Sequence, residues 1–320
     1  MSTDGSVPTI DFACHFLPTV EDRAIHESIT QSAGAPIHSD PDAALDVYRK
    51  TGVDGMVLSA PPHIGSENTE AVAHSNDALA DLVAAHDQLY GLAALPVAAG
   101  GDRAAREFRR CLDAGFNGGA IETDSDGVGI TDPELEPVLE VADRTGAPLL
   151  VHPTLFESLA PGVYGRELGL NAIWGREVAL GESICRAIHE GVLDRYPDLT
   201  LVYHHLGGNI ASMLGRIELR LREEFWPGLD GAKPYPEFRR QLEDRIYVDT
   251  GGYGDDCAAI RRTLDAFPSS NVLFGTDFPY EARTAEGVES IRSAIDDVTS
   301  MTDADRVRGG NALEVLVNVD

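Results

Sequence analysis

Three histidines and one aspartate are the residues of this sequence best suited to chemistry. His15, His152, His205 and Asp277 each stand near the end of a short apolar run. Imidazole nitrogens and carboxylate oxygens suit divalent ions such as zinc. A bound ion can polarise a carbonyl group or lower the pKa of a bound water. We therefore treat the four as one candidate metal and catalytic site, provided that the fold brings them together.

Eight apolar runs rich in β-branched residues are expected to form the strands that position these side chains. They span residues 8–16, 54–61, 89–97, 118–124, 147–153, 199–208, 245–252 and 271–279. Most of the intervening segments carry apolar residues at spacings of three and four, which is typical of amphipathic helices. Asn76 and Asp132 are typical of helix starts, and Gly146 of a helix end.

This alternation predicts a parallel sheet covered by helices on both faces. An open, doubly wound sheet is the alternative, but no GxGxxG follows the first strand. Eight repeats favour a single (β/α)8 TIM barrel, an α/β fold that we predict as one domain over residues 1–320. The site would then lie where the C-terminal ends of the strands converge. The long connections 154–180 and 209–244 leave these ends, so we expect both to cover the mouth of the barrel.

The surface charge excludes some partners. The chain has 53 acidic and 25 basic residues, a net charge of −28, and its only lysines are Lys50 and Lys233. Such a surface repels nucleic acid and anionic membranes. The charge and the shortage of lysine favour a halophilic protein of a high-salt cytoplasm, where screening removes the self-repulsion. An ordinary acidic protein is the alternative, and stability in dilute buffer would favour it.

Cysteine spacing and the N-terminal residues also favour the cytoplasm as the compartment of this protein. Four widely separated cysteines form neither a CxxC pair nor a disulfide framework, as in reduced cytoplasmic proteins. The first twelve residues lack the basic and apolar regions of a signal peptide. No apolar run approaches the roughly 20 residues that a membrane-spanning helix needs.

The motifs around the four side chains resemble those of the amidohydrolase-related family, which includes aminocarboxymuconate-semialdehyde decarboxylase, resorcylate-type decarboxylases and related lactone hydrolases. The similar segments are IDFACHFLP (10–18), LLVHP (149–153), HLGG (205–208), GTDFP (275–279) and NAL (311–313). Their order and spacing extend over nearly the whole chain.

The resemblance implies roles for individual residues. His15, His152 and Asp277 match metal ligands of the family, and Asp277 also matches a residue that takes part in proton transfer. His205 matches a histidine that is catalytic rather than a tight ligand. The resemblance also implies one divalent metal, for which we predict zinc with manganese as the alternative, and a homodimer.

The sequence departs from the family at Ala13, which stands where the first ligand of the opening pair is expected. Three outcomes are open. The remaining His15, His152 and Asp277 form an incomplete site with open positions for water and substrate, which we favour. Alternatively, Asp277 and His205 act as acid and base without metal, as in a lactone hydrolase, or only binding has survived. If Ala13 is a lesion, Ala13→His should raise metal affinity.

Alternation along the strands predicts which neighbours face the site. Cys14 should point toward the helices with Phe12, while Asp11 should share the face of His15. His204 and His205 should point to opposite faces, so that only His205 enters the barrel. The other histidines are expected at the solvated surface: His26, His38, His63, His74, His86 and His189.

Aromatic and basic residues near the strand ends could hold a planar, acidic substrate. We predict substrate binding by Arg166, Trp174 and Tyr280; other candidates are Tyr164, Arg176 and Tyr253. Asp249 is expected either to orient a ligand histidine or to be a buried polar group of the core.

We therefore predict an enzyme, a metal-dependent hydrolase or decarboxylase (carboxy-lyase) whose partner is a small carboxylated or carbonyl compound. In a decarboxylase, Asp277 or His205 would protonate the carbon that loses carbon dioxide. In a hydrolase, Asp277 would act as base and His205 would stabilise the oxyanion. A non-enzymatic binding protein is the alternative from another class. A nuclease is disfavoured because the chain is strongly acidic.

Overall fold

The structure, a computed structural model, describes residues 7–30, 39–154, 167–222 and 227–318. Eight parallel strands follow one another around a single sheet. They are β1 (Ile10–His15), β2 (Gly55–Ser59), β3 (Leu89–Ala94), β4 (Gly118–Glu122), β7 (Leu149–His152), β8 (Leu201–Tyr203), β9 (Ile246–Asp249) and β10 (Val272–Leu273). A short antiparallel hairpin, β5 (Asp124–Ser125) and β6 (Val128–Gly129), follows β4.

The first and last strands close the sheet into a barrel. The amide of Phe12 donates to the carbonyl of Phe274 at 2.8 Å, and the amide of His15 donates to that of Phe278 at 2.7 Å. Cys14 and Phe278 form a parallel bridge. The predicted (β/α)8 barrel is therefore confirmed. β10 itself is only two residues long, because Phe274 donates its amide to the carbonyl of Val307 instead of continuing the ladder.

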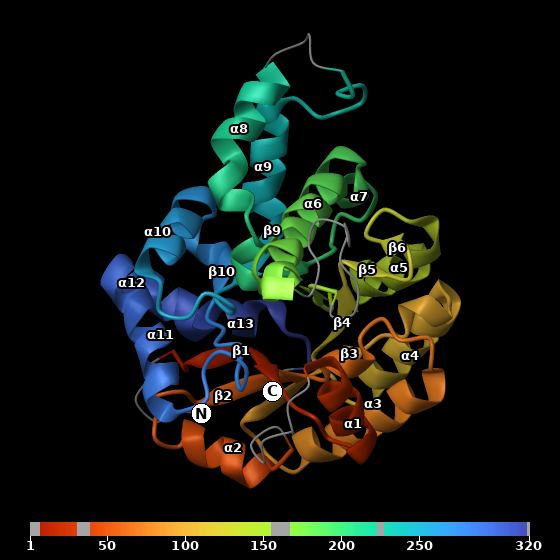
Figure 1. Cartoon of the computed structure of the whole chain (residues 1–320), viewed down its shortest axis with the longest axis vertical. Coiled ribbons are helices and arrows are strands. Elements are labelled where there is room, and N and C mark those ends of the chain that lie inside the picture. Colours follow the sequence, from red (N-terminus) through yellow and green to blue (C-terminus); the bar gives the residue numbers. More distant parts are fainter. Residues whose placement is uncertain (1–6, 31–38, 155–166, 223–226, 319–320) are drawn as a thin grey trace.

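Helices surround the barrel (Figure 1). They are α1 (Val20–Thr30), α2 (Pro41–Tyr48), α3 (Thr69–Ala84), α4 (Gly101–Asp113), α5 (Glu136–Thr145), α6 (Arg176–His189), α7 (Val192–Arg195), α8 (Ile210–Arg222), α9 (Tyr235–Arg245), α10 (Cys257–Ala266), α11 (Ala285–Val298), α12 (Met301–Asp305) and α13 (Asn311–Val315). No helix within the described ranges has the length and apolar character needed to cross a membrane.

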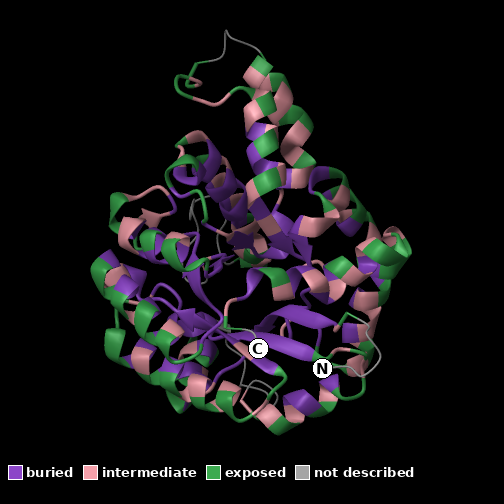
Figure 2. Cartoon of the chain, turned by 180° about the vertical axis from the view of Figure 1, so that it is seen from behind, coloured by how far each residue is buried: buried purple, intermediate pink, exposed green. Residues whose placement is uncertain are grey.

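Side chains of the strands pack alternately into the barrel and against the helices. Val57 and Leu92 belong to an inner apolar cluster, whereas Met56 and Leu58 pack in the larger cluster between the strands and the helices. The strands are buried along their length and the outer helix faces are exposed (Figure 2). A sheet buried on both faces explains why the strand sequences are continuous apolar runs.

A bulge in β1 reverses the predicted facing of Asp11 and Phe12, while Cys14 points toward the helices as predicted. The pairing with β2 shifts register between Asp11 and Cys14. Phe12 therefore packs in the inner cluster, while the Cys14 Sγ lies 3.2 Å from the hydroxyl of Tyr48 on α2. Asp11 faces the same tyrosine, which donates a hydrogen bond to its Oδ2 at 2.5 Å. The expectation that Asp11 shares the face of His15 is therefore wrong.

Two further expectations need correction. Asn76 does not begin a helix: α3 begins after Asn68, whose side chain accepts a hydrogen bond from the amide of Ala71, and Asn76 is buried within it. The connection 209–244 contains α8 and α9, which extend together beyond the other helices (Figure 1). The prediction that this connection covers the mouth is wrong. Asp132 and Gly146 do begin and end helical segments, as predicted.

Candidate metal centre and active site

Four histidines at the C-terminal ends of the strands are each held by one ring nitrogen. Nδ1 of His15 lies 2.9 Å from the Ser59 hydroxyl, and Nδ1 of His152 lies 2.8 Å from the carbonyl oxygen of Pro153. A hydrogen bond at Nδ1 fixes the ring and leaves Nε2 as the free donor atom for a metal.

The other two histidines are held by carboxylates. Nδ1 of His204 lies 2.9 and 2.8 Å from the two carboxylate oxygens of Asp249, and Nδ1 of His205 lies 2.8 Å from Glu177 Oε1. Because a carboxylate accepts a hydrogen bond, each Nδ1 carries the proton and each Nε2 is again free to bind or to exchange a proton. Asp249 thus orients a histidine, one of the two roles expected for it.

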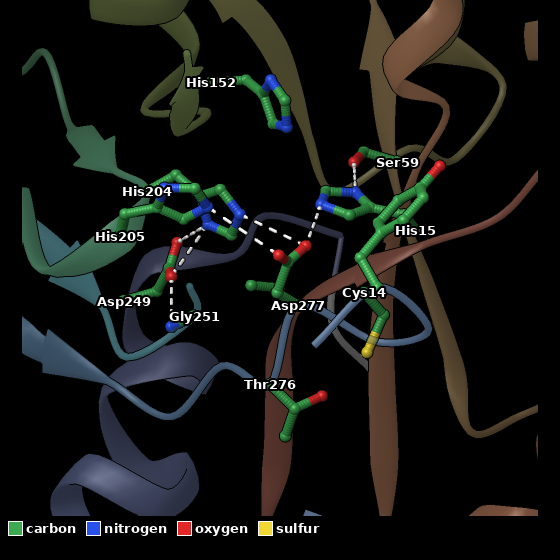
Figure 3. A network of polar contacts seen from close by, with 12 residues as sticks. Cys14, His15, Ser59, His152, His204, His205, Asp249, Gly251, Thr276 and Asp277 are labelled. Atoms are coloured by element: carbon green, nitrogen blue, oxygen red, sulfur yellow. Dashed lines mark hydrogen bonds and ion pairs between the residues drawn. The ribbon is translucent and has the colours of Figure 1, made fainter. Parts of the chain in front are cut away.

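Asp277 lies between these rings (Figure 3). Its Oδ1 is 3.0 Å from His15 Nε2 and 3.7 Å from His204 Nε2, while its Oδ2 is 3.8 Å from His205 Nε2. The ring of His152 lies 5.3 Å from those of His15 and His204. The structure therefore brings the four predicted residues together, with His204 among them.

His204 enters the site because β8 ends earlier than the sequence suggests. The strand stops at Tyr203, and both His205 and Leu206 then adopt a φ of +55°. The rule of alternating side chains applies only to extended chain, so both adjacent histidines turn toward Asp277. The expectation that only His205 enters the barrel is wrong. Asp277 also has a positive φ, +51°, and such backbone strain concentrates at functional sites.

Burial and charge set the protonation of the site. Burial opposes ionisation of Asp277, but its contacts with His15 and His204 hold its pKa well below the usual value. Burial lowers the pKa of His15, against the pull of Asp277. Burial and the neighbouring imidazoles lower the pKa of His152 well below the usual value. An ionised carboxylate beside neutral imidazoles is the protonation state that metal ligands require.

His204 differs from the other two buried rings. Burial alone would lower its pKa, but the charge and hydrogen bond of Asp249, with Asp277 beyond, raise it to about 10. In the absence of a cation, His204 is therefore a buried imidazolium between two carboxylates.

A divalent ion fits this donor set. The ligand atoms of His15, His152 and His204 all lie within 4.8 Å of one another, as do those of His204, His205 and Asp277. Among the described residues, Nε2 of His204 is buried without a hydrogen-bond partner, and Nε2 of His15 contacts the Asp277 carboxylate at 3.0 Å. Buried polar atoms are rarely left unpaired, and imidazole with carboxylate suits zinc or manganese.

A cavity of about 190 Å³ opens beside these side chains. It is lined by His26, Pro61, His152, Pro153, Ala172, Arg176, Glu177, His205, Gly252, Asp277, Tyr280 and Glu281. Ala172 and Arg176 belong to the connection after β7, so the described part of this connection borders the mouth as predicted.

Arg176 supplies the positive charge of this cavity. Burial lowers its pKa, and the charges of Asp277 and Glu177 oppose that shift. Its Nε is buried with no hydrogen-bond partner among the described residues. Trp174, two residues earlier, faces away and is 59% exposed, because Ala172 and Arg176, four residues apart, occupy the inner side of this turn. The structure thus places Arg176 at the site and Trp174 outside it.

Two of the basic and aromatic candidates cannot be placed. Arg166 and Tyr164 lie outside the described residues. Tyr253 lies behind the site, where its hydroxyl donates to Glu177 Oε2 at 3.2 Å.

Tyr280 borders the cavity, and a histidine predicted at the surface joins it. The hydroxyl of Tyr280 lies 3.1 Å from Nδ1 of His26, which is 4% exposed, and its ring centre is 5.5 Å from that of His15. His63 is buried as well, with Nε2 3.0 Å from Asp22 Oδ1. The expectation that His26 and His63 are solvated is wrong. His63 follows the C-terminal end of β2, a position that marks it as a possible site residue, whereas His26 lies on α1, away from any strand end.

The family of the chain follows from the comparison with known proteins. Residues 10–316 match the family model described as amidohydrolase. The chain belongs to this family, as its motifs predicted, and the prediction of an enzyme among the amidohydrolase-related hydrolases and carboxy-lyases is confirmed.

Individual relatives are decarboxylases. The chain is 26% identical over 292 residues to 2-amino-3-carboxymuconate-6-semialdehyde decarboxylase of Dictyostelium discoideum, covering 87% of this chain and 76% of that protein. It is 27% identical over 324 residues to gamma-resorcylate decarboxylase of Rhodococcus jostii, covering 91% and 94%. Its fold is similar to that of a Polaromonas dihydroxybenzoic acid decarboxylase with bound manganese and an inhibitor, 2-nitroresorcinol (TM-score 0.79, 20% identity, 96% of each chain).

Proposed function

We propose that this chain is a carboxy-lyase that uses a divalent ion, manganese or zinc, to release carbon dioxide from a small carboxylated aromatic compound. The observation that carries the proposal is the convergence of His15, His152 and Asp277: the ring centres of the two histidines lie 5.3 Å apart, and Asp277 Oδ1 lies 3.0 Å from His15 Nε2, beside a cavity that Arg176 lines. Two relatives, from Dictyostelium and Rhodococcus, are decarboxylases, which favours carboxy-lyase over hydrolase chemistry.

In this proposal, His15, His152 and Asp277 hold the ion. A bound divalent ion acts as a Lewis acid and stabilises negative charge that develops on the oxygens of the substrate. Ala13 contributes no ligand atom to this set.

Arg176 binds the substrate's acidic group. Its guanidinium faces the cavity with an unpaired Nε, and a planar guanidinium can bind a carboxylate through two hydrogen bonds. The ring of Tyr280 forms one wall against which a planar ring can stack. At about 190 Å³, the cavity suits a single-ring acid rather than a larger molecule.

His205 delivers the proton. Loss of carbon dioxide breaks a carbon–carbon bond, and the electron pair left on the ring carbon takes a proton from Nε2 of His205 as a carbon–hydrogen bond forms. Glu177, bound to Nδ1, stabilises the imidazolium from which this proton leaves. Asp277 is poorly suited to donate, because its pKa is well below the usual value and it is therefore ionised.

The acidic surface supports two further proposals. With a net charge of −28 and only two lysines, the chain is proposed to work in a high-salt cytoplasm. The homodimer implied by the family resemblance remains a prediction, which sedimentation in high salt would test.

The test is a substrate screen with metal-loaded protein. Protein purified in high salt is stripped with chelator, reloaded with manganese or zinc, and incubated with hydroxybenzoic and other aryl carboxylic acids. The expected result is release of carbon dioxide that depends on metal and is abolished in His205→Gln. Turnover of lactones with no turnover of any carboxylic acid would contradict the proposal.

A further inference from the structure

We propose that His204 supplies the metal ligand that Ala13 cannot, so that His15, His152, His204 and Asp277 hold the ion while His205 remains free to transfer a proton. This inference rests on the proposed metal-dependent function. According to this inference, Ala13 does not leave the site short of a ligand, because a histidine that follows β8 takes the place of the ligand missing from β1.

The first support is the arrangement of the rings. The ring centres of His15, His152 and His204 form a nearly regular triangle, with separations of 5.3, 5.3 and 5.5 Å. Their ligand atoms lie within 4.8 Å of one another, a set to which His205 does not belong. A single ion can therefore contact all three rings.

The two carboxylate oxygens of Asp277 face different groups, one the proposed metal ligands and the other the proposed proton donor. Oδ1 faces the triangle, at 3.0 Å from His15 Nε2 and 3.7 Å from His204 Nε2. Oδ2 faces His205 Nε2 at 3.8 Å. The side chain that completes the ligand set thus presents its other oxygen to the proposed proton donor.

The second support is how Asp249 holds His204. Both side chains are fully buried, and both carboxylate oxygens lie within hydrogen-bonding distance of Nδ1. This is the carboxylate–histidine arrangement that orients metal ligands. A purely structural histidine would need a partner for its second nitrogen, but Nε2 of His204 has no hydrogen bond among the described residues.

The third support is the space around Ala13. A Cβ added to Gly275 would lie 2.7 Å from the Cβ of Ala13 and 3.2 Å from Oδ1 of Asp249. A Cβ added to Gly251 would lie 2.7 Å from Cε1 of His204. Two glycines and one alanine therefore leave just enough room for the Asp249–His204 pair. Because Ala13 and Asp249 both border the space beside Gly275, a larger side chain at position 13 would crowd the Asp249–His204 pair.

The test compares His204→Gln with His205→Gln, a matched control because each histidine is held at Nδ1 by a carboxylate. Chelator-treated protein is titrated with manganese, and free manganese is followed by its EPR signal. Loss of a ligand is expected to raise the manganese Kd about 100-fold or more, given that loss of an outer contact to a ligand already costs about 10–100-fold. His205→Gln is expected to change Kd less than about 5-fold. An equal or larger effect of His205→Gln would overturn the inference.

Ala13→His gives an independent comparison. Alone, it is expected to leave the manganese Kd unchanged or raised, because the new imidazole competes with Asp249 and His204 for space. Combined with His204→Ala, it is expected to bind manganese more tightly than His204→Ala alone. Tighter binding by the single Ala13→His variant would show that position 13 is simply vacant and would overturn the inference.

A measurement on the wild type covers the case in which His204 variants do not fold. Pulsed EPR of the manganese-loaded protein counts coordinated imidazole nitrogens, and three are expected in the wild type and in His205→Gln. Two in the wild type would overturn the inference while leaving the proposed function intact. Failure of the wild type to bind one equivalent of manganese or zinc would refute both.

Discussion

Glu177 accepts a hydrogen bond from Nδ1 of His205 at 2.8 Å, so the first turn of α6 determines how this histidine presents its other nitrogen to Asp277. The residue before it, Arg176, borders the cavity. Two consecutive residues thus link the proposed substrate binding and the proposed proton transfer, and each can be changed separately.

Glu177→Gln is expected to lower kcat about 10–100-fold with little change in KM or in metal content, because glutamine stabilises the protonated ring less than a carboxylate does. Steady-state kinetics and metal analysis of the variant would test this expectation. Tyr253→Phe, which removes the hydrogen bond to Glu177 Oε2 at 3.2 Å and the 3.5 Å contact with the carbonyl oxygen of Gly208, is the milder control. An unchanged kcat would argue against His205 as the proton donor.

Arg176→Gln is expected to lower kcat/KM about 100-fold, mainly through KM, because the substrate's carboxylate loses a charge-assisted hydrogen-bonding partner. Arg176→Lys should recover part of this loss through its charge. Trp174→Ala is the matched control, because it lies two residues away and its side chain is 59% exposed. A loss in Trp174→Ala as large as that in Arg176→Gln would contradict the assignment.

The metal-free protein is expected to lose stability between about pH 6.5 and 10. The pKa of His204 is raised to about 10, from an ordinary value of 6.5, by Asp249 and Asp277. Its ion pairs therefore stabilise the fold fully below the unfolded pKa, and this stabilisation disappears as pH rises through the folded pKa. Denaturant unfolding with chelator present should show a loss of about a few kcal/mol. His204→Gln should flatten this part of the profile, and an identical profile would contradict the expectation.

Tyr48→Phe is expected to destabilise the fold by about 1–3 kcal/mol, because it removes one of the donors that satisfy the buried carboxyl of Asp11. Burial already raises the pKa of Asp11 to about 6. Tyr90→Phe is the control, since Tyr90 is half-buried and has no hydrogen bond to its hydroxyl among the described residues. Equal unfolding midpoints for the two variants would show that the contact to Asp11 contributes no stability.

The sequence predicted the barrel and the meeting of His15, His152, His205 and Asp277 because these depend on regular features. Apolar runs locate the strands, and the C-terminal ends of parallel strands converge. Asp249 was a candidate for the same reason, since it ends β9.

The missed features arise where the chain departs from regular geometry. The bulge in β1 turned Asp11 outward, and the early end of β8 brought His204 into the site. Neither event leaves a periodic signal, because one depends on register against β2 and the other on a positive φ at a residue that is not glycine. His204 and His205 are adjacent in the sequence, but the alternation of side chains along a strand does not apply to them, because β8 ends at Tyr203.

Closure of the barrel between β1 and the segment after β10 has a consequence for biosynthesis. Asp277 is synthesised long after His15, and the two become neighbours only when the amide of His15 reaches the carbonyl of Phe278. A prematurely terminated polypeptide that lacks the GTDFP segment has no Asp277 carboxylate. It also lacks the hydrogen bonds that join this segment to β1 and so position His15. Capture of a metal ion at this site would then require that the chain has been made at least as far as this segment and that the barrel has closed.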